Sequence, residues 1–368
     1  MTTSTRLSRR GVLAGVGAAA AAAPFGFPRP AIAQGAKVRY TLSWLPTGQY
    51  AYVYMARQLG YWKQRGIEVE IVAGRGSLGA IQGVSTGQFD MGGASTGANI
   101  LSLMKGVDIR IIGTQGYDAS LGILVPTNGP IKNPKDLEGR SIGVTAAGGD
   151  TPFLPAYYKL AGVDGAKVTT VALDSQLIER AVMTGKVDCM VAFGMSSIPN
   201  FISADFAVRF LPMADVGIRF YWINTLARSE YLAANKSLIA DFHDGLAEGM
   251  KFALLNPEET VERHLKEHSE IAISANGKLY TELGVGMVAV CMTAPESREH
   301  GLGYSDFASL ETQAKLVKQY TGGPNDPDPP AIASIATNDF VGKVTLTPAE
   351  WETVQAKTRK YAALLGKA

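Results

Sequence analysis

The sequence predicts an α/β protein built from two similar lobes, each a mostly parallel sheet flanked by helices. Short β-branched runs alternate with short helical patterns along the chain, which is typical of parallel sheets. In addition, residues 160–193 echo residues 59–95: both have a Gly-containing helix end, a β-branched run, a short helix and Thr-Gly-x-x-Asp. An echo about 100 residues away exceeds the 20–50-residue periods of solenoid repeats. It therefore indicates two related lobes.

Residues 1–33 are predicted to be an export signal and not part of the fold. Ser8-Arg9-Arg10-Gly11-Val12-Leu13 is a twin-arginine signature, and Ala31-Ile32-Ala33 fits cleavage after Ala33. The apolar stretch between them is shorter than the ~20 residues that span a bilayer. A disordered Ala-rich tail is the alternative, but the twin arginine, the lack of acidic residues and the cleavage pattern favour export to the periplasm by the twin-arginine route. No cysteine lies near the cleavage site, so the sequence does not indicate a lipid anchor.

Charge and cysteine content narrow the function further. The formal net charge of +2 includes four arginines of the leader, so the chain without it carries about −2. This lacks the basic excess that nucleic-acid binding requires. Only two cysteines occur. Cys189 lies in an apolar run and is expected to be a buried small hydrophobe; whether it forms a disulfide with Cys291 stays open.

In the first half of the chain, apolar alternation and breakers predict strands at 38–44, 67–73, 89–94, 109–114 and 121–125, with helices at 50–59, from Gly79 to 86 and at 96–105. After Leu137-Glu138-Gly139 the pattern restarts, with strands at 141–145, 168–173, 187–193 and an apolar run at 220–226, and helices at 152–161 and 177–184. Beyond Ser229 the chain is expected to be mostly helical, with helices at 238–255, 257–266 and 278–292. Thr347-Pro348-Ala349-Glu350 is a capping box that opens a final helix to about Leu365.

Gly74 to Gly79 matches G-x-G-x-x-G literally. A dinucleotide fingerprint belongs on the first strand of its unit, with an acid about 20 residues further on. Here the strand is the second, and residues 97–101 read GANIL. We therefore interpret the motif as a tight strand-to-helix turn whose free backbone N–H groups suit a polar ligand. An exported oxidoreductase that uses a dinucleotide cofactor is the alternative reading.

The loops that follow successive predicted strands share a composition. All are small, polar or glycine-rich, and they lie at 45–49, 74–77, 95–96, 146–151 and 194–197. In an open parallel sheet, ligands bind beyond the carboxyl ends of the strands. With Trp44, Tyr50 and Phe193 as neighbours, these loops suit a small solute, although each aromatic alone is equally consistent with ordinary core.

Catalytic and metal-binding patterns have little support. No G-x-S-x-G occurs, and no spacing pairs a cysteine with a histidine. His264 and His268 stand four apart on a predicted helix, which is half of a metal site or, as we expect, a solvated helix face. We therefore expect no enzyme activity, no cofactor and no metal.

Several motifs resemble one protein family. They are Ser43-Trp44-Leu45-Pro46, Gly66-Ile67-Glu68-Val69, Gly76-Ser77, Thr86-Gly87-Gln88-Phe89-Asp90, Leu137 to Gly143 and Thr184-Gly185-Lys186-Val187-Asp188, within residues 37–265. Together they resemble the periplasmic solute-binding proteins of ABC importers for nitrate, alkanesulfonates, taurine and thiamine pyrimidine precursors.

The resemblance implies the type II periplasmic binding protein fold, with two hinge crossings near 122–126 and 220–224. Lobe 1 would comprise 34–122 and 223–368, including the C-terminal helices, and lobe 2 would comprise 123–222. Solute would be held between the lobes. The contact residues that the resemblance implies are Trp44, Gln49, Tyr50, Ser77, Ser95, Thr96, Gly148, Gly149, Asp150, Thr151, Phe193, Tyr221 and Trp222.

The resemblance also bears on solute and partners. Thr47 stands where thiamine-precursor binders tend to carry Asn, Arg75 is the one loop cation near the expected cleft, and Asp150 would oppose an anion. A planar, near-neutral or zwitterionic solute is favoured, with a sulfonate next. The implied partners are an inner-membrane ABC permease and its ATPase, with the binding protein a monomer. A solute sensor for a receptor kinase stays open, whereas a fungal-type pyrimidine synthase is disfavoured because its cysteine-rich segment is missing.

Overall fold

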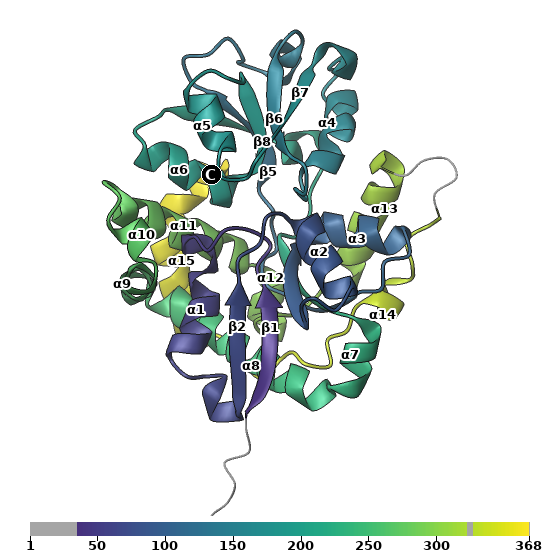
Figure 1. Cartoon of the computed structure of the whole chain (residues 1–368), viewed down its shortest axis with the longest axis vertical. Coiled ribbons are helices and arrows are strands. Elements are labelled where there is room, and N and C mark those ends of the chain that lie inside the picture. Colours follow the sequence, from purple (N-terminus) through teal and green to yellow (C-terminus); the bar gives the residue numbers. More distant parts are fainter. Residues whose placement is uncertain (1–34, 322–326, 368) are drawn as a thin grey trace, which may run out of the picture. The chain divides into compact units, whose positions relative to one another are not determined.

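The computed structural model describes residues 35–321 and 327–367, so the predicted export signal and its cleavage site lie outside the described residues. The elements all belong to the compact unit Ala36–Ala368. They form two five-stranded sheets, each the centre of one lobe (Figure 1). The first has the order β2-β1-β3-β10-β4, with β1 Ala36–Thr41, β2 Ile67–Val72, β3 Met91–Ser95, β4 Arg110–Thr114 and β10 Ile223–Ala227. The second has the order β7-β6-β8-β5-β9, with β5 Leu121–Pro126, β6 Ser141–Thr145, β7 Thr169–Leu173, β8 Cys189–Phe193 and β9 Val208–Pro212.

The two sheets have the same plan, in which one strand runs against the other four. Strand β10 is antiparallel to β3 and β4, and β5 is antiparallel to β8 and β9. The other neighbours pair in parallel, as predicted. Each antiparallel strand is the one that the chain forms directly after crossing from the other lobe. Because the remaining strands end toward the other lobe, an entering strand has to run the opposite way.

Two connections join the sheets, and they lie against each other. The outgoing connection spans 115–120 and the returning one 213–222. The N–H of Gln115 donates to the Ile223 carbonyl, that of Trp222 to Gly116, and that of Ala119 to Phe220, each at 2.8 Å. The first crossing was expected at 122–126, but these residues form β5, whose backbone is paired to β8 and β9. The crossing therefore precedes that strand.

The helices cover both sheets and were largely anticipated. Those packed with the first sheet or following β10 are α1 Ala51–Gln58, α2 Ser77–Ser85, α3 Thr96–Met104, α7 Ser229–Ala234, α8 Lys236–Leu255, α9 Pro257–Glu267, α10 Ser269–Ala272, α11 Gly277–Met292, α12 Pro295–His300, α13 Phe307–Thr321, α14 Ile332–Ile335 and α15 Pro348–Ala362. The second lobe contributes α4 Leu154–Leu160, α5 Ile178–Met183 and α6 Gly194–Ser203. Short 3₁₀ turns are η1 Gly48–Tyr50, η2 Lys63–Arg65, η3 Pro134–Leu137, η4 Thr151–Phe153, η5 Gly165–Lys167, η6 Met213–Val216 and η7 Ala363–Leu365.

Some elements differ from the prediction. Residues 194–197, expected as a loop, are the first turn of α6, which carries Pro199 inside it. Proline usually ends a helical pattern, and this hid the helix in the sequence. Strand β9 and helix α13 were also not predicted. By contrast, the Thr347 capping box is confirmed: its hydroxyl accepts the Glu350 N–H at 3.3 Å, and the Glu350 carboxylate accepts the Thr347 N–H at 2.7 Å.

The repeated Thr-Gly-x-x-Asp motif ends a helix in each lobe. The hydroxyls of Thr86 and Thr184 each donate to the carbonyl one turn earlier, at 2.9 and 2.8 Å. Gly87 and Gly185 follow with φ of 79° and 70°, the left-handed conformation that glycine adopts without strain. The motif is thus a helix stop.

The aspartate of the same motif ties neighbouring strands together. Asp90 accepts the backbone N–H of Arg39 at 2.7 Å, and Asp188 accepts that of Ser141 at 2.7 Å. Because both acceptors sit just before a central strand and both donors lie on the next strand, each contact fixes the strand register. These duplicated contacts explain the sequence echo as a requirement of folding.

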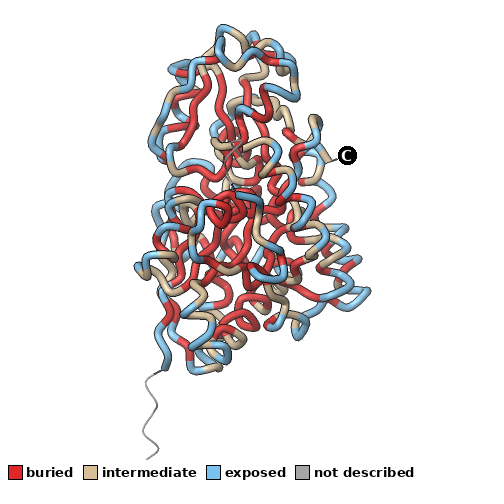
Figure 2. Tube along the Cα trace, turned by 90° about the vertical axis from the view of Figure 1, so that its right-hand side faces the viewer, coloured by how far each residue is buried: buried red, intermediate tan, exposed pale blue. Residues whose placement is uncertain are grey.

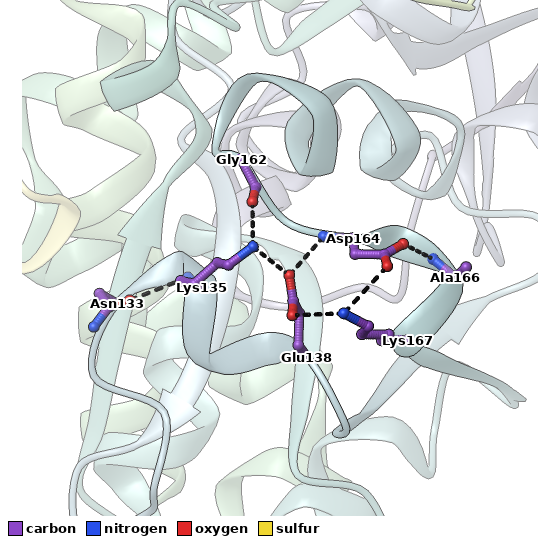
Figure 3. Close-up of polar contacts among 7 residues, drawn as sticks. All are labelled: Asn133, Lys135, Glu138, Gly162, Asp164, Ala166 and Lys167. Atoms are coloured by element: carbon purple, nitrogen blue, oxygen red, sulfur yellow. Dashed lines mark hydrogen bonds and ion pairs between the residues drawn. The ribbon is translucent and has the colours of Figure 1, made fainter.

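Glu138 plays a similar part on the surface of the second lobe (Figure 3). Its carboxylate accepts the Asp164 N–H at 2.8 Å and pairs with Lys135 and Lys167 at 2.5 and 3.5 Å. The hydrogen bond from Lys135 is the main cause that lowers the pKa of Glu138 to about 2. The network fastens the turn before β6 to the turn before β7. The Leu-Glu-Gly motif therefore serves the fold.

Buried residues form the interior of both lobes (red in Figure 2). In the first lobe, Trp62 stacks on Phe242 with ring centroids 5.0 Å apart and donates its indole N–H to the Phe242 carbonyl. Cys189 is buried as expected, and Cys291 is buried too; both are free thiols, which answers the open question of a disulfide. Among the described residues, none of the helices has the length and apolar character needed to cross a bilayer.

Candidate functional site

A small cavity lined by residues of both lobes lies between the two sheets. Its walls come from the carboxyl ends of strands in both sheets and from the returning connection. The first lobe provides Ser43, Trp44, Tyr50, Gly76, Ser77 and Ile223 of β10; the second provides Thr145, Gly148, Gly149, Asp150, Ile178, Met190, Val191, Ala192, Phe193, Ser196 and Ser197; the connection provides Trp222.

Most of the residues that we expected at the site meet in this cavity. Eight line it: Trp44, Tyr50, Ser77, Gly148, Gly149, Asp150, Phe193 and Trp222. Five others lie outside its lining: Gln49, Ser95, Thr96, Thr151 and Tyr221. Thr96 donates to Asn224 at 2.8 Å and Tyr221 to Glu296 at 2.7 Å, so both support the fold beside the site.

Aromatic rings form one part of the wall. Tyr50 is buried, and its ring centroid lies 5.8 Å from that of Trp222. Its hydroxyl forms a short hydrogen bond with Ser43, and burial raises the pKa of Tyr50 well above its ordinary value. Trp44 and Phe193 are half-buried. The cavity therefore offers flat apolar surfaces with hydroxyls beside them, which suits a ring-containing molecule.

The lobes touch where glycines allow it. The N–H of Leu78, in the first turn of α2, donates to the Ala147 carbonyl of the second lobe at 3.2 Å. A Cβ on Gly76 would lie 2.1 Å from that carbonyl oxygen, and one on Gly149 would lie 2.4 Å from the Ser95 Oγ. Any side chain at these positions would force the lobes apart. The second glycine of the G-x-G-x-x-G match is thus explained by close approach of the lobes, and Gly74 by its contact with the Leu42 carbonyl in the same lobe, whereas Gly79 has room for a side chain.

A polar pair between a half-buried serine and a buried glutamine spans the cleft at the edge of the cavity. The Ser196 hydroxyl of the second lobe donates to the Gln49 Oε1 of the first at 2.7 Å. Gln49 is fully buried, and its Nε2 has no partner among the described residues; the same holds for the Ser95 Oγ. An unpaired buried donor costs about 1–3 kcal/mol. Such atoms next to a cavity are therefore well placed to bind a solute.

Asp150 brings a carboxyl group into the cavity. It is 8% exposed, and its Oδ1 accepts the Thr151 N–H at 2.8 Å and the Thr151 hydroxyl at 3.3 Å. Burial raises the pKa of Asp150 from 3.8 to about 6, against the effect of these hydrogen bonds. Arg75, expected near the cleft, is exposed and does not line the cavity. Asp150 is thus the charged side chain of the cavity wall.

The histidine pair differs from the prediction. His264 is fully buried and His268 is 9% exposed, so a solvated helix face is wrong. The His264 Nε2 lies 3.2 Å from the Pro46 carbonyl, and both rings pack edge-on to Tyr54. Burial lowers the pKa of His264 to about 3, which keeps it neutral. Within 35–321 and 327–367, no group of three or more potential ligands could hold a metal, so the pair serves packing beneath the Trp44 loop.

Several wall residues escaped sequence reasoning. Ile178 on α5 and Met190 to Ala192 on β8 were not anticipated, and Ser196 and Ser197, expected in a strand-end loop at 194–197, lie on α6 instead. The sequence echo between the two lobes could have indicated one of these residues, Ser197. The offset that pairs Asp90 with Asp188 pairs Asn99, buried beside the first-lobe strand end, with Ser197. The position of the second helix was lost because Pro199 masked it.

Comparisons with known proteins agree with this architecture. The family model described as NMT1/THI5 like matches residues 47–260. The riboflavin-binding protein RibY of Chloroflexus aurantiacus is 26% identical over 88% of this chain and 90% of its own. The formylaminopyrimidine-binding protein of Halalkalibacterium halodurans is 21% identical over 74% of this chain and 82% of its own. The alkanesulfonate-binding protein SsuA of Xanthomonas axonopodis pv. citri, solved with MOPS, superposes with a TM-score of 0.64 at 15% identity over 83% of this chain and 99% of its own, which confirms the predicted two-lobe fold.

Proposed function

The chain belongs to the NMT1/THI5-like family, and from this premise we propose that it captures a small organic solute between its lobes and delivers it to an ABC importer. One observation carries the proposal. Both lobes place strand-end loops around one cavity, and just outside its lining Gln49 Nε2 and Ser95 Oγ are buried without a partner among the described residues. Solute binding would supply those partners and hold the lobes together, which is how ligand favours a closed form.

The cavity favours a flat ring over a sulfonate. Its walls include Trp44, Tyr50, Phe193 and Trp222, and none of its lining residues is Lys, Arg or His. A sulfonate would face Asp150 with no cation to balance it. The relatives bind riboflavin or formylaminopyrimidine by their names, so a heteroaromatic solute like a thiamine precursor is the class that we propose, with a sulfonate second.

Location and partners follow from the same role. We place the protein in the periplasm, exported by the twin-arginine route and cleaved after Ala33. There it would dock as a monomer on an inner-membrane permease with its ATPase. In this proposal lobe 1 is built on the first sheet, from residues 36–114 and 223–367, and lobe 2 on the second sheet, from residues 121–212. Trp44, Gln49, Tyr50, Ser77, Ser95, Gly148 to Asp150, Phe193 and Trp222 contact or surround the solute.

The protein would release its solute unchanged. Protein purified from periplasm and examined by native mass spectrometry should carry a small molecule that dissociates intact. In a thermal-shift panel of pyrimidines, flavins, aromatic acids and sulfonates, the bound class should stabilise the fold by about 2.7 kcal/mol at 100 times Kd. Failure of every compound, with no co-purified molecule, would contradict solute capture. A visible cofactor spectrum or turnover of the bound compound would favour the oxidoreductase alternative.

A further inference from the structure

Two buried carboxyl groups stand at the second-lobe wall of the cavity. Asp150 lines it and is 8% exposed. Glu179 is 6% exposed and lies behind Ser197, whose hydroxyl donates to the Glu179 Oε1 at 2.9 Å. Among the described residues, the donors to these groups are neutral: the Thr151 N–H and hydroxyl donate to Asp150, and the Ser197 hydroxyl donates to Glu179.

Within 35–321 and 327–367, no cationic side chain forms an ion pair with either carboxyl group. Among the described residues, the ion pairs join other acids, and the cavity lining contains no Lys, Arg or His. Arg75, two residues from Ser77 in sequence, is exposed. A carboxylate removed from water without a partner is costly. Burial accordingly raises the pKa of both Asp150 and Glu179. The second lobe therefore holds an uncompensated negative charge that a bound solute could neutralise.

The aromatic part of the cavity wall also favours a positively charged solute. Trp44 and Tyr50 come from the first lobe and Trp222 from the returning connection, and Phe193 completes the ring-bearing lining. Aromatic faces attract organic cations, most strongly when both are removed from water. Aromatic rings opposite a buried carboxyl group make a site that distinguishes solutes by charge as well as by shape.

We propose that the solute is an organic cation, with its positive charge in or beside a flat ring, and that Asp150 is its counter-ion. This rests on the proposed function, because it names the class of solute that the same cavity takes. The free Oδ2 of Asp150 accepts from or faces the cationic group, while the ring lies against Trp44 and Tyr50. Gln49 Nε2 is then a donor for an acceptor atom of the solute.

Three probes of one shape and different charge test this. 1-Methylnicotinamide is a cation, nicotinamide is neutral and nicotinate is an anion. In calorimetric titrations at pH 7.5 the cation should bind at least tenfold more tightly than nicotinamide, and nicotinate more weakly still. Asp150→Asn should abolish the preference for the cation, whereas Glu70→Gln, an exposed carboxylate of β2, should keep it. Circular dichroism would establish that both variants are folded, and Glu179→Gln provides a second variant expected to reduce the preference.

Other outcomes separate the two proposals. Equal or tighter binding of nicotinamide or nicotinate would overturn the cation assignment, as would a preference that survives in Asp150→Asn. If none of the three probes binds but riboflavin, a formylaminopyrimidine or MOPS does, the cation assignment is overturned and solute capture stands. If none of these six compounds binds to folded protein and native mass spectrometry finds no co-purified molecule, the proposed function itself fails.

Discussion

At the scale of single residues, the buried carboxyl of Asp150 should make stability depend on pH. In the folded protein the pKa of Asp150 is about 6, against 3.8 ordinarily, so folding favours the protonated form. This contribution is fully present below pH 3.8, is lost as pH rises through about 6, and amounts to about 3 kcal/mol. Asp150→Asn stays neutral. It should therefore be as stable as the parent at pH 4 and more stable at pH 8, measured by urea unfolding.

Asp164→Asn is a suitable control for this pH dependence, because Asp164 is largely exposed and should show no comparable gain. The difference in unfolding free energy between the parent and Asp150→Asn should change between pH 4 and pH 8. An equal difference at both pH values would contradict a buried, uncompensated carboxyl at Asp150. The comparison is made without solute, since a bound cation would itself stabilise the charged form.

We expect Trp44 to contribute more to solute affinity than to the stability of the fold. It is half-buried and lines the cavity, while the core beneath it is formed by fully buried side chains. Trp44→Ala should weaken affinity for an aromatic solute about tenfold, since a ring pair contributes about 0.5–1.5 kcal/mol beyond burial. Calorimetric titration measures this. The matched control Trp62→Ala should instead lower stability, because Trp62 is stacked in the core. Unchanged affinity in Trp44→Ala would remove that ring from the site.

At the scale of elements, the Gly148–Gly149 loop should set how far the lobes can close. A Cβ on Gly149 would lie 2.4 Å from the Ser95 Oγ and 2.8 Å from the Ser77 Cβ. Gly149→Ala should therefore weaken solute affinity by at least tenfold while leaving the unfolding free energy of solute-free protein within about 1 kcal/mol. Gly79→Ala is the control, since its Cβ would meet nothing closer than 3.9 Å.

Affinity and stability need to be measured together for this pair of variants. If Gly149→Ala binds as tightly as the parent, the contact between the loop and α2 is not part of closure. If Gly149→Ala and Gly79→Ala lose the same amount of stability, the loss comes from strain in the local backbone and not from a change in lobe closure.

The elements were predictable where one interaction dominates. The run at 67–73 is a strand because its apolar residues alternate, and the Thr347 capping box opens α15 as local chemistry requires. The reversed direction of β5 and β10 was not predictable, because it follows from which lobe the chain enters. Helix α6 was missed for a similar reason. The internal Pro199 disfavours a helix locally, and packing against α11 stabilises the helix in the folded protein. Ser196 and Ser197 were therefore expected in a loop at the site and lie in the first turn of this helix instead.

At the scale of the whole folded unit, the two lobes should unfold together. Helix α11 follows β10 in the chain and packs on α6 of the second lobe. The end of the chain does the same: Leu365 is buried against Gly194, and Lys367 pairs with Asp118 of the outgoing connection at 3.0 Å. The paired connections add three backbone hydrogen bonds. With so many contacts crossing between the sheets, neither lobe keeps its buried surface when the other unfolds.

This cooperativity can be measured with urea. Trp44, Trp62, Trp222 and Trp351 all lie outside the second sheet, so fluorescence reports the first lobe and the connections, whereas far-ultraviolet circular dichroism reports both lobes. We expect the two transitions to coincide, as in two-state unfolding. Leu365→Ala should lower the midpoint of both by the same amount, because the residue bridges the lobes. A circular dichroism transition in two steps, with only the first or the second matched by fluorescence, would show instead that the lobes are independent and that closure needs only the connections.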